Sequence, residues 1–312
     1  MPDIAGRISD INEKSKCVKL AEQIELACLM EATARKPGNV HPAAAFDDLC
    51  YDDFVRASRA IAEPLTAASV AGIGRTVLDS VQATRAATGT NVNLGIVLLL
   101  APLAAVPINV SLESGIGAIL EGTTIEDAGH VYIAIRLAQP GGMGQVSSQD
   151  IGERPTVRLR DAMRLASDRD RIAEQYANGF QLVFEASKKL TEFTGGSDDW
   201  EDAIISLHVW ILSKWPDTLI ARKCGWEIAR EASERAAKLF SQSETGSPLN
   251  PDQLRAFDKW LRADGHRRNP GTTADLVAAA LFVALRDGLI VAPSREEIDQ
   301  AANRQDSVTL LE

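Results

Sequence analysis

The sequence has few of the residue types that β-sheets need. Aromatic residues make up 5% of its 312 residues, and runs in which Val, Ile, Thr or Tyr alternate with polar residues are scarce. Strands are enriched in these residue types, whereas alanine and leucine dominate the apolar residues of this chain. The composition therefore predicts an all-α protein in which helices pack on helices.

Cysteines are few, and the sequence has no evident targeting or membrane segment. The four cysteines form no C-x-x-C pair, a pattern typical of reduced thiols in a cytosolic protein rather than of a disulfide framework or zinc site. The first residues lack the basic-then-apolar order of a signal peptide. The longest apolar stretch, 94–106, contains glycine and proline and has 13 residues, too few to span a bilayer. We therefore expect a cytoplasmic protein that does not bind membranes.

Basic residues are also few relative to acidic ones, 33 against 43. The formal net charge is -10, and a negative field repels nucleic acid and anionic membranes. A small ligand that carries phosphate is still compatible with this charge, provided that a local group of cations binds it. The basic pairs at 35–36, 222–223 and 267–268 are candidates, although each pair alone is equally compatible with a solvated surface.

Helical periodicity is abundant. Apolar residues recur three and four positions apart in many windows, and short connections containing Gly, Pro and Asn separate them. The windows are 15–34, 51–71, 75–87, 94–106, 124–138, 156–190, 200–213, 217–241, 251–263, 273–287 and 295–303. No repeat or long linker divides the chain. We therefore expect residues 1–312 to form a single-domain, compact multi-helix bundle whose active-site cleft is built from glycine-containing loops.

The first of these loops follows the first predicted helix. Pro37 disfavours helical geometry at the residue before it, and Gly38 permits a tight turn. Lys36, Asn39 and His41 then lie on an irregular segment. Their side chains are free to point into a cleft, where a cation, an amide and an imidazole suit a phosphate-bearing ligand.

The second loop, 88–95, opens the most apolar helix of the chain. Asn91 and Asn93 lie between glycines there. One interpretation is a turn followed by a helix cap. The other is a group of free backbone N–H groups and two amides around a phosphate or ribose.

The third loop leads into an alanine-rich helix. Arg267, Arg268, Asn269 and Gly271 precede the helix, and arginines beside the positive end of a helix form a strong anion site. We expect these arginines to keep Asp275, which follows them, ionised at neutral pH.

Helix capping is the alternative role for several of these polar residues. Thr272 and Asp275 have the spacing of a capping box, with Asp in place of Glu or Gln. Asp52 is expected to cap the helix that it begins, and capping is a weaker alternative for Asp48. Residues 168–171, Asp-Arg-Asp-Arg, are compatible with a lattice of helical charge pairs.

The loops resemble the triphosphoribosyl-dephospho-CoA synthase family, which serves citrate lyase and malonate decarboxylase. The family's Pro-Lys-Pro-Gly turn is Arg35-Lys-Pro-Gly38 here. Its Thr-Gly-Gly-x-Asn-Thr-His-Lys-Gly loop corresponds to Thr88-Gly-Thr-Asn-Val-Asn-Leu-Gly95, and its Ser-Pro-Gly-Gly-Ser-Ala-Asp-Leu-Leu segment to Asn269-Pro-Gly-Thr-Thr-Ala-Asp-Leu-Val277. The order and spacing of the motifs agree over about 30–290.

The resemblance implies an all-helical fold and a defined reaction. The 2′-hydroxyl of 3′-dephospho-CoA attacks the ribose C1 of ATP, adenine leaves, and the triphosphate stays on the transferred ribose. Such a reaction needs a carboxylate near an oxocarbenium-like transition state, acid and base groups, and cations for the phosphates. Magnesium is expected with the ATP. The expected partners are small nucleotides, namely ATP and dephospho-CoA or another acceptor, and a homodimer is compatible with the sequence.

The resemblance and the loops together give a set of candidate site residues. The catalytic candidates are Asp48, Asp275 and His41, of which Asp48 and Asp275 are also the candidate metal ligands. The candidates for binding substrate or phosphate are Lys36, Gly38, Asn39, Asn91, Asn93, Arg222, Lys223, Arg267, Arg268, Asn269, Gly271 and Thr272. We expect the loops at 36–48, 88–95 and 267–275 to converge on one cleft with a locally positive surface.

The sequence departs from the family pattern at two places. Asn93 and Leu94 stand where the family has histidine and lysine, and Phe46 stands where it has a histidine two residues before Asp48. These changes remove titratable groups and a phosphate contact. Two alternatives therefore stay open: a related nucleotide or phosphoribosyl transfer in coenzyme synthesis of a one-carbon pathway (tetrahydromethanopterin or methanofuran type), and a nucleotide-binding protein without catalysis.

Overall fold

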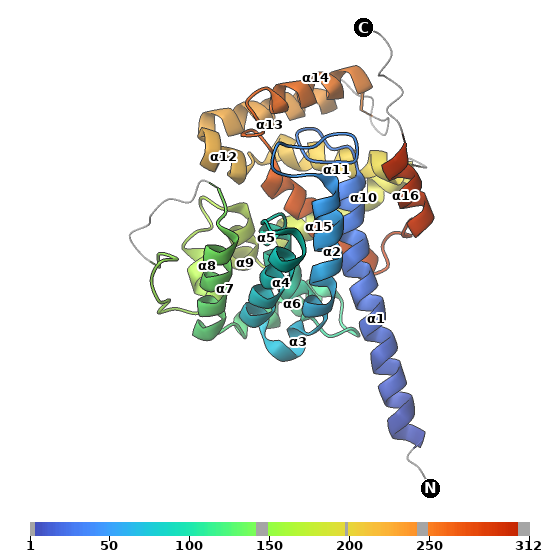
Figure 1. Ribbon diagram of the computed structural model, residues 1–312, viewed down its shortest axis with the longest axis vertical. Helices are drawn as coiled ribbons and strands as arrows, with labels where there is room; N and C mark the ends of the chain where they lie inside the picture. Colours follow the sequence, from blue (N-terminus) through green and yellow to red (C-terminus); the bar gives the residue numbers. More distant parts are fainter. Residues whose placement is uncertain (1–3, 142–148, 197–198, 242–248, 305–312) are drawn as a thin grey trace.

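The computed structural model describes residues 4–141, 149–196, 199–241 and 249–304. This part of the chain contains sixteen helices and no β-strand (Figure 1), which confirms the predicted all-α fold. The helices are α1 (Ile4–Thr33), α2 (Tyr51–Thr66), α3 (Ala68–Ala71), α4 (Ile73–Thr88), α5 (Leu94–Ala104), α6 (Leu112–Glu121), α7 (Ile125–Ala138), α8 (Leu159–Arg164), α9 (Arg171–Asn178), α10 (Gln181–Gly196), α11 (Trp200–Lys214), α12 (Thr218–Cys224), α13 (Trp226–Ser241), α14 (Pro251–Arg262), α15 (Gly271–Arg286) and α16 (Arg295–Asn303).

Helix α15 lies at the centre of the bundle because its sequence is apolar on every side. Residues 276–285 are all buried, and a helix that is hydrophobic all round must be covered by neighbours. Helices α1, α5, α10 and α11 pack against it (Figure 1). The N-terminal turns of α15, which carry Asp275, are thereby held inside the molecule.

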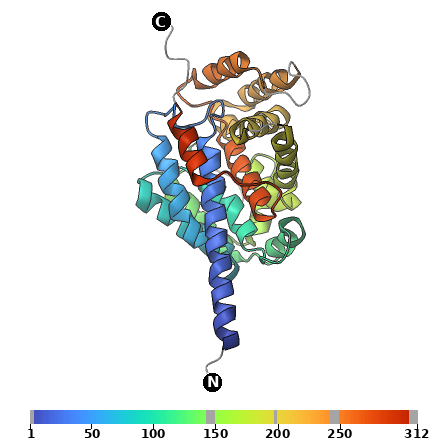
Figure 2. The same ribbon diagram turned by 90° about the vertical axis from the view of Figure 1, so that its right-hand side faces the viewer.

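Four helices lie side by side along one flank. Helix α1 packs on α2, α2 on α4, and α4 on α7, and Figure 2 shows α16 beside the upper part of α1. Helix α2 shows the pattern that this layer requires: Ala57, Ile61 and Leu65 are four residues apart and buried. Apolar residues at this spacing lie on one face of a helix. Helix α5 is buried from Ile96 to Ala104 and fills the space between this layer and α15.

A second hydrophobic cluster lies under α13 and α14. It joins residues of α11, α12, α13 and α14, including Leu212, Ile220 and Leu261. Helix α11 supplies Ile204 and Leu207 to the main core and Leu212 to this cluster, so both cores share it. The cluster positions α12, which carries Arg222 and Lys223.

The predicted windows agree with the helices except at several breaks and one missed element. The window 51–71 is two helices, α2 and α3, divided at Ala67. The window 156–190 is three helices, of which α9 ends at Gly179 (φ +78°), and the window 217–241 is two, because Gly225 (φ +91°) ends α12. Helix α6 at 112–121 was not predicted. Two glycines interrupt its apolar pattern, and glycine lowers helix propensity.

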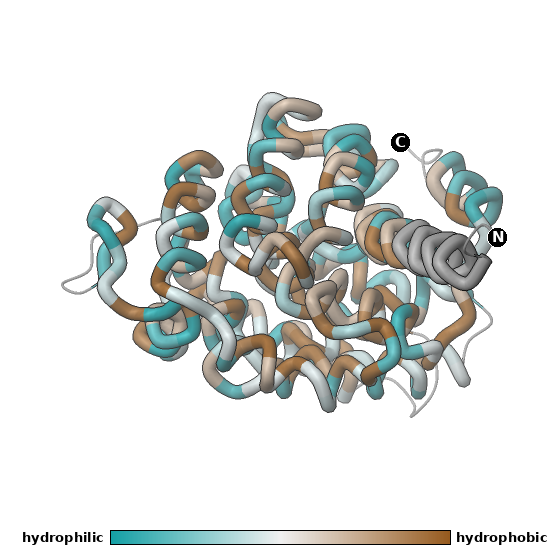
Figure 3. The backbone as a smooth tube through the Cα atoms, turned by 90° about the horizontal axis from the view of Figure 1, so that it is seen from below, coloured by the Kyte–Doolittle hydropathy of each residue, from teal (hydrophilic) through white to brown (hydrophobic). Residues whose placement is uncertain are grey.

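Hydrophobic and hydrophilic positions alternate along most helices (Figure 3), as packing against a common core requires. Within the described residues, none of the helices combines the length and the apolar character needed to cross a membrane.

Candidate active site

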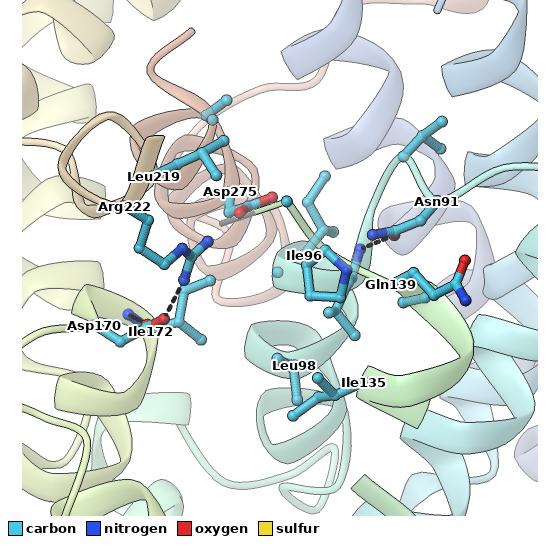
Figure 4. A pocket seen from close by; sticks show the side chains of 18 of the residues that line it. Asn91, Ile96, Leu98, Ile135, Gln139, Asp170, Ile172, Leu219, Arg222 and Asp275 are labelled. Carbon is cyan, nitrogen blue, oxygen red and sulfur yellow. Dashed lines mark hydrogen bonds and ion pairs between the residues drawn. The ribbon is translucent and has the colours of Figure 1, made fainter. Parts of the chain in front are cut away.

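One large cavity brings together residues that are far apart in the sequence. Its volume is about 960 Å³, near the upper end of the range of about 300–1,000 Å³ for small-molecule sites. Residues from the three loops 36–48, 88–95 and 267–275 line it, together with residues of α7, α9 and α12. Figure 4 shows Asp275 and Arg222 on one side, Asn91 and Gln139 on the other, and Leu98 below.

The cavity separates the predicted site residues into two groups. Those that line it are Asn39, Asp48, Asn91, Arg222, Lys223, Asn269, Gly271 and Asp275. Those that do not are Lys36, Gly38, His41, Asn93, Arg267, Arg268 and Thr272.

Asp275 lies in the cavity wall at the point where α15 meets α5. Gly95 allows this approach, because a Cβ atom at Gly95 would collide with the Asp275 carboxylate. Within the described part of the chain, the Asp275 carboxyl group makes no hydrogen bond or ion pair. Asp275 is half-buried and lines the cavity, so its carboxyl group is accessible to a ligand bound there.

The electrostatic surroundings of Asp275 are the opposite of those expected. Burial, together with the negative charges of Glu31 and Asp217, raises the pKa of the Asp275 carboxyl well above its usual range, and Arg222 only partly opposes this shift. The expectation that Arg267 and Arg268 keep it ionised is therefore wrong.

Those two arginines face elsewhere. Arg267 donates to the carbonyl oxygen of Lys223 at 2.8 Å. The Arg268 guanidinium lies 4.6 Å from the centre of the Trp260 ring, over which Arg235 also lies. The cation–π contact of Arg268 stabilises the connection between α14 and α15. Neither Arg267 nor Arg268 lines the cavity.

The expected caps are also placed differently. Pro270 is the N-cap of α15 and gives no side-chain cap bond, so Thr272 and Asp275 lie within the helix. Thr272 instead shares a hydrogen bond of 3.1 Å with the hydroxyl of Thr218. The N-cap of α2 is Cys50, whose backbone N–H donates to Asp53, and Asp52 is not the cap.

Arg222 is held in the cavity wall by an acidic partner. Asp170 accepts from Arg222 at 2.7 Å through Oδ2 (Figure 4). Its Oδ1 accepts from the backbone N–H groups of Ile172 and Ala173 and so caps α9. Asp170 therefore caps α9 and pairs with Arg222. It does not take part in the lattice of charge pairs that we expected for 168–171.

Lys223 follows Arg222 on α12 and also lines the cavity. Burial lowers the pKa of its ammonium group, and the negative charge of Asp48 is the largest effect that opposes this. Lys223 and Asp48 therefore influence each other although they come from different ends of the chain.

Asp217 joins the N-terminal ends of α12 and α15. Its Oδ1 accepts from the backbone N–H groups of Leu219 and Ile220, and its Oδ2 accepts from the N–H (2.7 Å) and hydroxyl (2.8 Å) of Thr273. This buried carboxylate fixes the helix that carries Arg222 to the helix that carries Asp275.

Lys36 is fully buried and pairs with Glu31, Nζ lying 3.0 Å from Oε1. It also donates to the carbonyl oxygens of Glu31 and Ala34. Lys36 therefore does not reach the cavity, whereas Glu31 does. Gly38 is required for packing, since its φ is +78° and a Cβ atom there would lie 2.8 Å from Leu261.

His41 is buried outside the cavity lining. Its Nδ1 accepts from the backbone N–H of Ala43. Burial and the nearby charges of Arg262 and Lys36 lower its pKa to about 3, so the ring is neutral at physiological pH. Asn39, by contrast, lines the cavity and donates to Asn269 Oδ1 at 2.7 Å, which ties the first loop to the third.

The two asparagines of the second loop have different surroundings. Asn91 lines the cavity and accepts from the backbone N–H of Leu94 at 3.3 Å. Asn93 is buried and accepts from the hydroxyl of Thr84 at 3.0 Å. Leu94, at the position where the family motif has lysine, faces the cavity.

Charge in the cavity is balanced rather than positive. The described lining contains four basic and five acidic side chains: Arg85, Arg169, Arg222 and Lys223, and Glu31, Asp48, Asp150, Asp170 and Asp275. The predicted excess of positive charge is therefore not found in this lining, because acids from α1, α9 and α15 face the same space as the cations.

A histidine that the sequence did not single out lies beside Asp48. His266 Nε2 is 3.9 Å from Asp48 Oδ1, and the His266 ring stacks on Phe46 with centroids 4.6 Å apart. Both rings line the cavity. His266, in the connection before α15, therefore places an imidazole next to Phe46. Phe46 itself stands where the family pattern has histidine.

Four residues that line or support the cavity were not predicted as site residues: Glu31, Asp170, Asp217 and His266. Glu31 and Asp217 lie five residues before Lys36 and Arg222 respectively, so their closeness in sequence to candidate cations was the available signal. The charged segment 168–171 drew attention to Asp170, but its partner Arg222 is 52 residues away, and the partner of His266, Asp48, is more than 200 residues away.

Comparison with known proteins agrees with the resemblance. A family described as ATP:dephospho-CoA triphosphoribosyl transferase (CitG) matches residues 17–293. The structure is similar to a crystal structure from Archaeoglobus fulgidus described as a triphosphoribosyl-dephospho-CoA synthase, with a TM-score of 0.60 and 26% identity over 74% of this chain and 98% of that chain. No protein of curated function matches. The family match spans most of the chain, which confirms the predicted transferase: the chain belongs to the ATP:dephospho-CoA triphosphoribosyl transferase family.

Proposed function

We propose that this cavity is where the chain transfers the triphosphoribosyl group of ATP to its acceptor. The observation that carries the proposal is the Asp275 carboxyl group, which faces the cavity, lies against Gly95 and has no hydrogen-bond partner among the described residues. Carboxyl groups with raised pKa values in clefts are typical of catalytic sites.

The chemistry assigns a role to this carboxyl group. The C1′–N bond to adenine breaks and a C1′–O bond to the acceptor hydroxyl forms, while adenine gains one proton and the hydroxyl loses one. Because the pKa of Asp275 is raised, its carboxyl group keeps a proton that it would donate to the departing adenine. Glu31, paired with Lys36 and lining the same cavity, would stabilise positive charge on the ribose.

The triphosphate would lie against α12. Arg222 and Lys223 both line the cavity, and the guanidinium of Arg222 is oriented by Asp170. A planar guanidinium binds phosphate oxygens in pairs, and an ammonium adds a point charge. The amide of Asn91 on the opposite wall (Figure 4) would bind the polar part of a substrate.

The carboxylates fit a magnesium ion that arrives with ATP rather than one that the protein holds alone. Among the described residues, no three His, Cys, Asp or Glu side chains are grouped as they would be around a metal. Magnesium bound to nucleotide phosphates needs only one or two protein carboxylates. Of the two predicted ligands, Asp48 is open to solvent and near Lys223, so it is better suited to this role than Asp275. When bound, the ion would neutralise triphosphate charge.

A different acceptor is the second candidate, and the observation that favours it is Leu94. This side chain faces the cavity where the family motif has lysine, so one cation for an anionic acceptor is absent at that position. The reaction type would be the same, with the hydroxyl of another coenzyme precursor in place of dephospho-CoA.

The test is chromatographic measurement of adenine released from ATP, with mass spectrometry of the second product. We expect release that needs magnesium and increases when dephospho-CoA is added, and a product heavier by one triphosphoribosyl group. Release with another acceptor only would support the second candidate. Absence of release with every acceptor would contradict the proposed site.

A further inference from the structure

His266 adopts an unusual backbone conformation. Its φ is +54°, in the left-handed region that residues other than glycine seldom adopt. Three of the four such residues in the described ranges, Gln139, Gln149 and His266, line the cavity. Strained residues persist where the surrounding fold imposes them, and they concentrate at functional sites. Here the turn is fixed by the carbonyl oxygen of His266, which accepts from the N–H of Asn269 at 3.2 Å.

The conformation places the imidazole flat against Phe46. The two ring centroids are 4.6 Å apart and the planes differ by 27°, while the Arg262 guanidinium lies 5.7 Å from the Phe46 centroid. The His266 side chain keeps 29% of its surface exposed, and both rings line the cavity. Phe46 covers one face of the imidazole, and part of the His266 side chain stays open to the cavity.

Polar groups share the cavity lining with His266. The Asp48 carboxylate lies 3.9 Å from Nε2 of His266. The linked amides of Asn39 and Asn269 line the cavity from the same two loops. A flat aromatic surface bordered by amide and carboxylate groups matches the two parts of a nucleobase, which has an apolar face and a hydrogen-bonding edge.

We propose that His266, supported by Phe46, is a stacking platform for the purine base of a nucleotide bound in this cavity. This inference rests on the proposed function, which places nucleotides there. Both substrates of the family reaction carry adenine, so either ATP or the acceptor nucleotide supplies the base. Stacking of a base on an aromatic side chain contributes about tenfold to a hundredfold in affinity.

The experiment compares His266→Asn and His266→Phe with wild type. Asparagine tolerates the left-handed conformation and removes the ring, whereas phenylalanine keeps a ring without the imidazole nitrogens. His130→Asn, on α7 outside the cavity lining, is the matched control. Calorimetric titrations use ATP, dephospho-CoA and inorganic triphosphate, and thermal melting establishes that each variant is folded.

We expect His266→Asn to weaken binding of one of the two nucleotides about tenfold or more, with triphosphate binding unchanged. The nucleotide that is weakened is the one that supplies the base. His266→Phe should recover most of the affinity.

Unchanged nucleotide affinity in folded His266→Asn would overturn the inference, as would equal loss of triphosphate binding or failure of phenylalanine to restore affinity. If wild type binds neither nucleotide, the proposed function fails together with the platform. If wild type binds both nucleotides and His266→Asn binds each of them with the wild-type affinity, only the platform fails.

Discussion

Asp275 is a carboxyl group whose neighbours are mostly acidic. Burial and the charges of Glu31 and Asp217 raise its pKa, and the described residues offer it no hydrogen bond. A carboxyl group of this kind lowers stability whenever it must ionise. Its position in the wall of a large cavity is what our proposal of a catalytic role for Asp275 rests on.

Replacement of Asp275 by Asn should therefore not destabilise the protein at neutral pH. The unfolded chain loses the Asp275 proton near pH 3.9, whereas the folded chain keeps it to higher pH because the folded-state pKa is raised. Wild type consequently loses stability as pH rises through this interval. The Asn variant does not titrate, so its melting temperature relative to wild type should increase from about pH 4 to pH 7. A variant that is clearly less stable than wild type at pH 7 would refute this account.

At the scale of elements, the site depends on close contacts between helix ends. Helix α5 reaches α15 at Gly95. Asp217 fixes the start of α12 to the start of α15, and Asp170 ties α9 to α12 through Arg222. These three connections place Asp275 and Arg222 on the same wall.

Gly95→Ala should disturb the site through packing alone. The new Cβ would collide with the Asp275 carboxylate and lie 2.7 Å from Cδ1 of Ile172. We expect a loss of about 1–3 kcal/mol, the usual cost of overpacking, and reduced adenine release. Gly117→Ala in α6 is the control, because nothing lies within 4 Å of its Cβ position. Equal stability and activity of both variants would show that α5 and α15 are not in close contact.

Asp217→Ala should be strongly destabilising. It removes the acceptor of four hydrogen bonds, from Leu219, Ile220 and Thr273, and leaves buried donors unsatisfied. Each such donor costs about 1–3 kcal/mol, so we expect a loss of at least about 3 kcal/mol in urea unfolding. Asn250→Ala removes the exposed side-chain cap of α14, which accepts from the N–H groups of Asp252 and Gln253, and should cost only about 1 kcal/mol. Similar losses in both variants would contradict the role of Asp217.

The helices were predictable because their apolar spacing is local information. The windows 94–106 and 273–287 contain α5 and α15 nearly in full. The loops with glycine beside polar residues also led to the prediction of Asp48 and Asp275, both of which line the cavity. What the sequence could not show was which charges meet in space. Lys36, for example, pairs with Glu31 and does not line the cavity.

At the scale of the whole molecule, the helices of the described residues pack around α15, and two histidines, His41 and His208, are buried in the fold. His41 and His208 both have their pKa lowered to about 3, by burial and then by positive neighbours, Arg262 for the first and Lys36 for the second. Both rings are therefore neutral in the folded protein. In the unfolded chain they bind a proton near pH 6.5.

These histidines predict acid sensitivity. Between about pH 6.5 and pH 3 the unfolded state binds more protons than the folded state, so stability falls as pH falls, by up to about 1.4 kcal/mol per pH unit for each histidine. His208→Leu should make the dependence of urea unfolding on pH shallower across this range. An unchanged slope in a folded His208→Leu variant would mean that His208 is not buried in its neutral form.

The central claim is that the cavity carboxyl group acts in the transfer reaction, and turnover of Asp275→Asn beside wild type tests it most directly. The measurement is the initial rate of adenine release from ATP with magnesium and acceptor, on protein that melts cooperatively. We predict that the variant still binds nucleotide but releases adenine at least about a hundredfold more slowly, the scale of a positioned acid group. A folded variant that turns over at the wild-type rate would contradict the account.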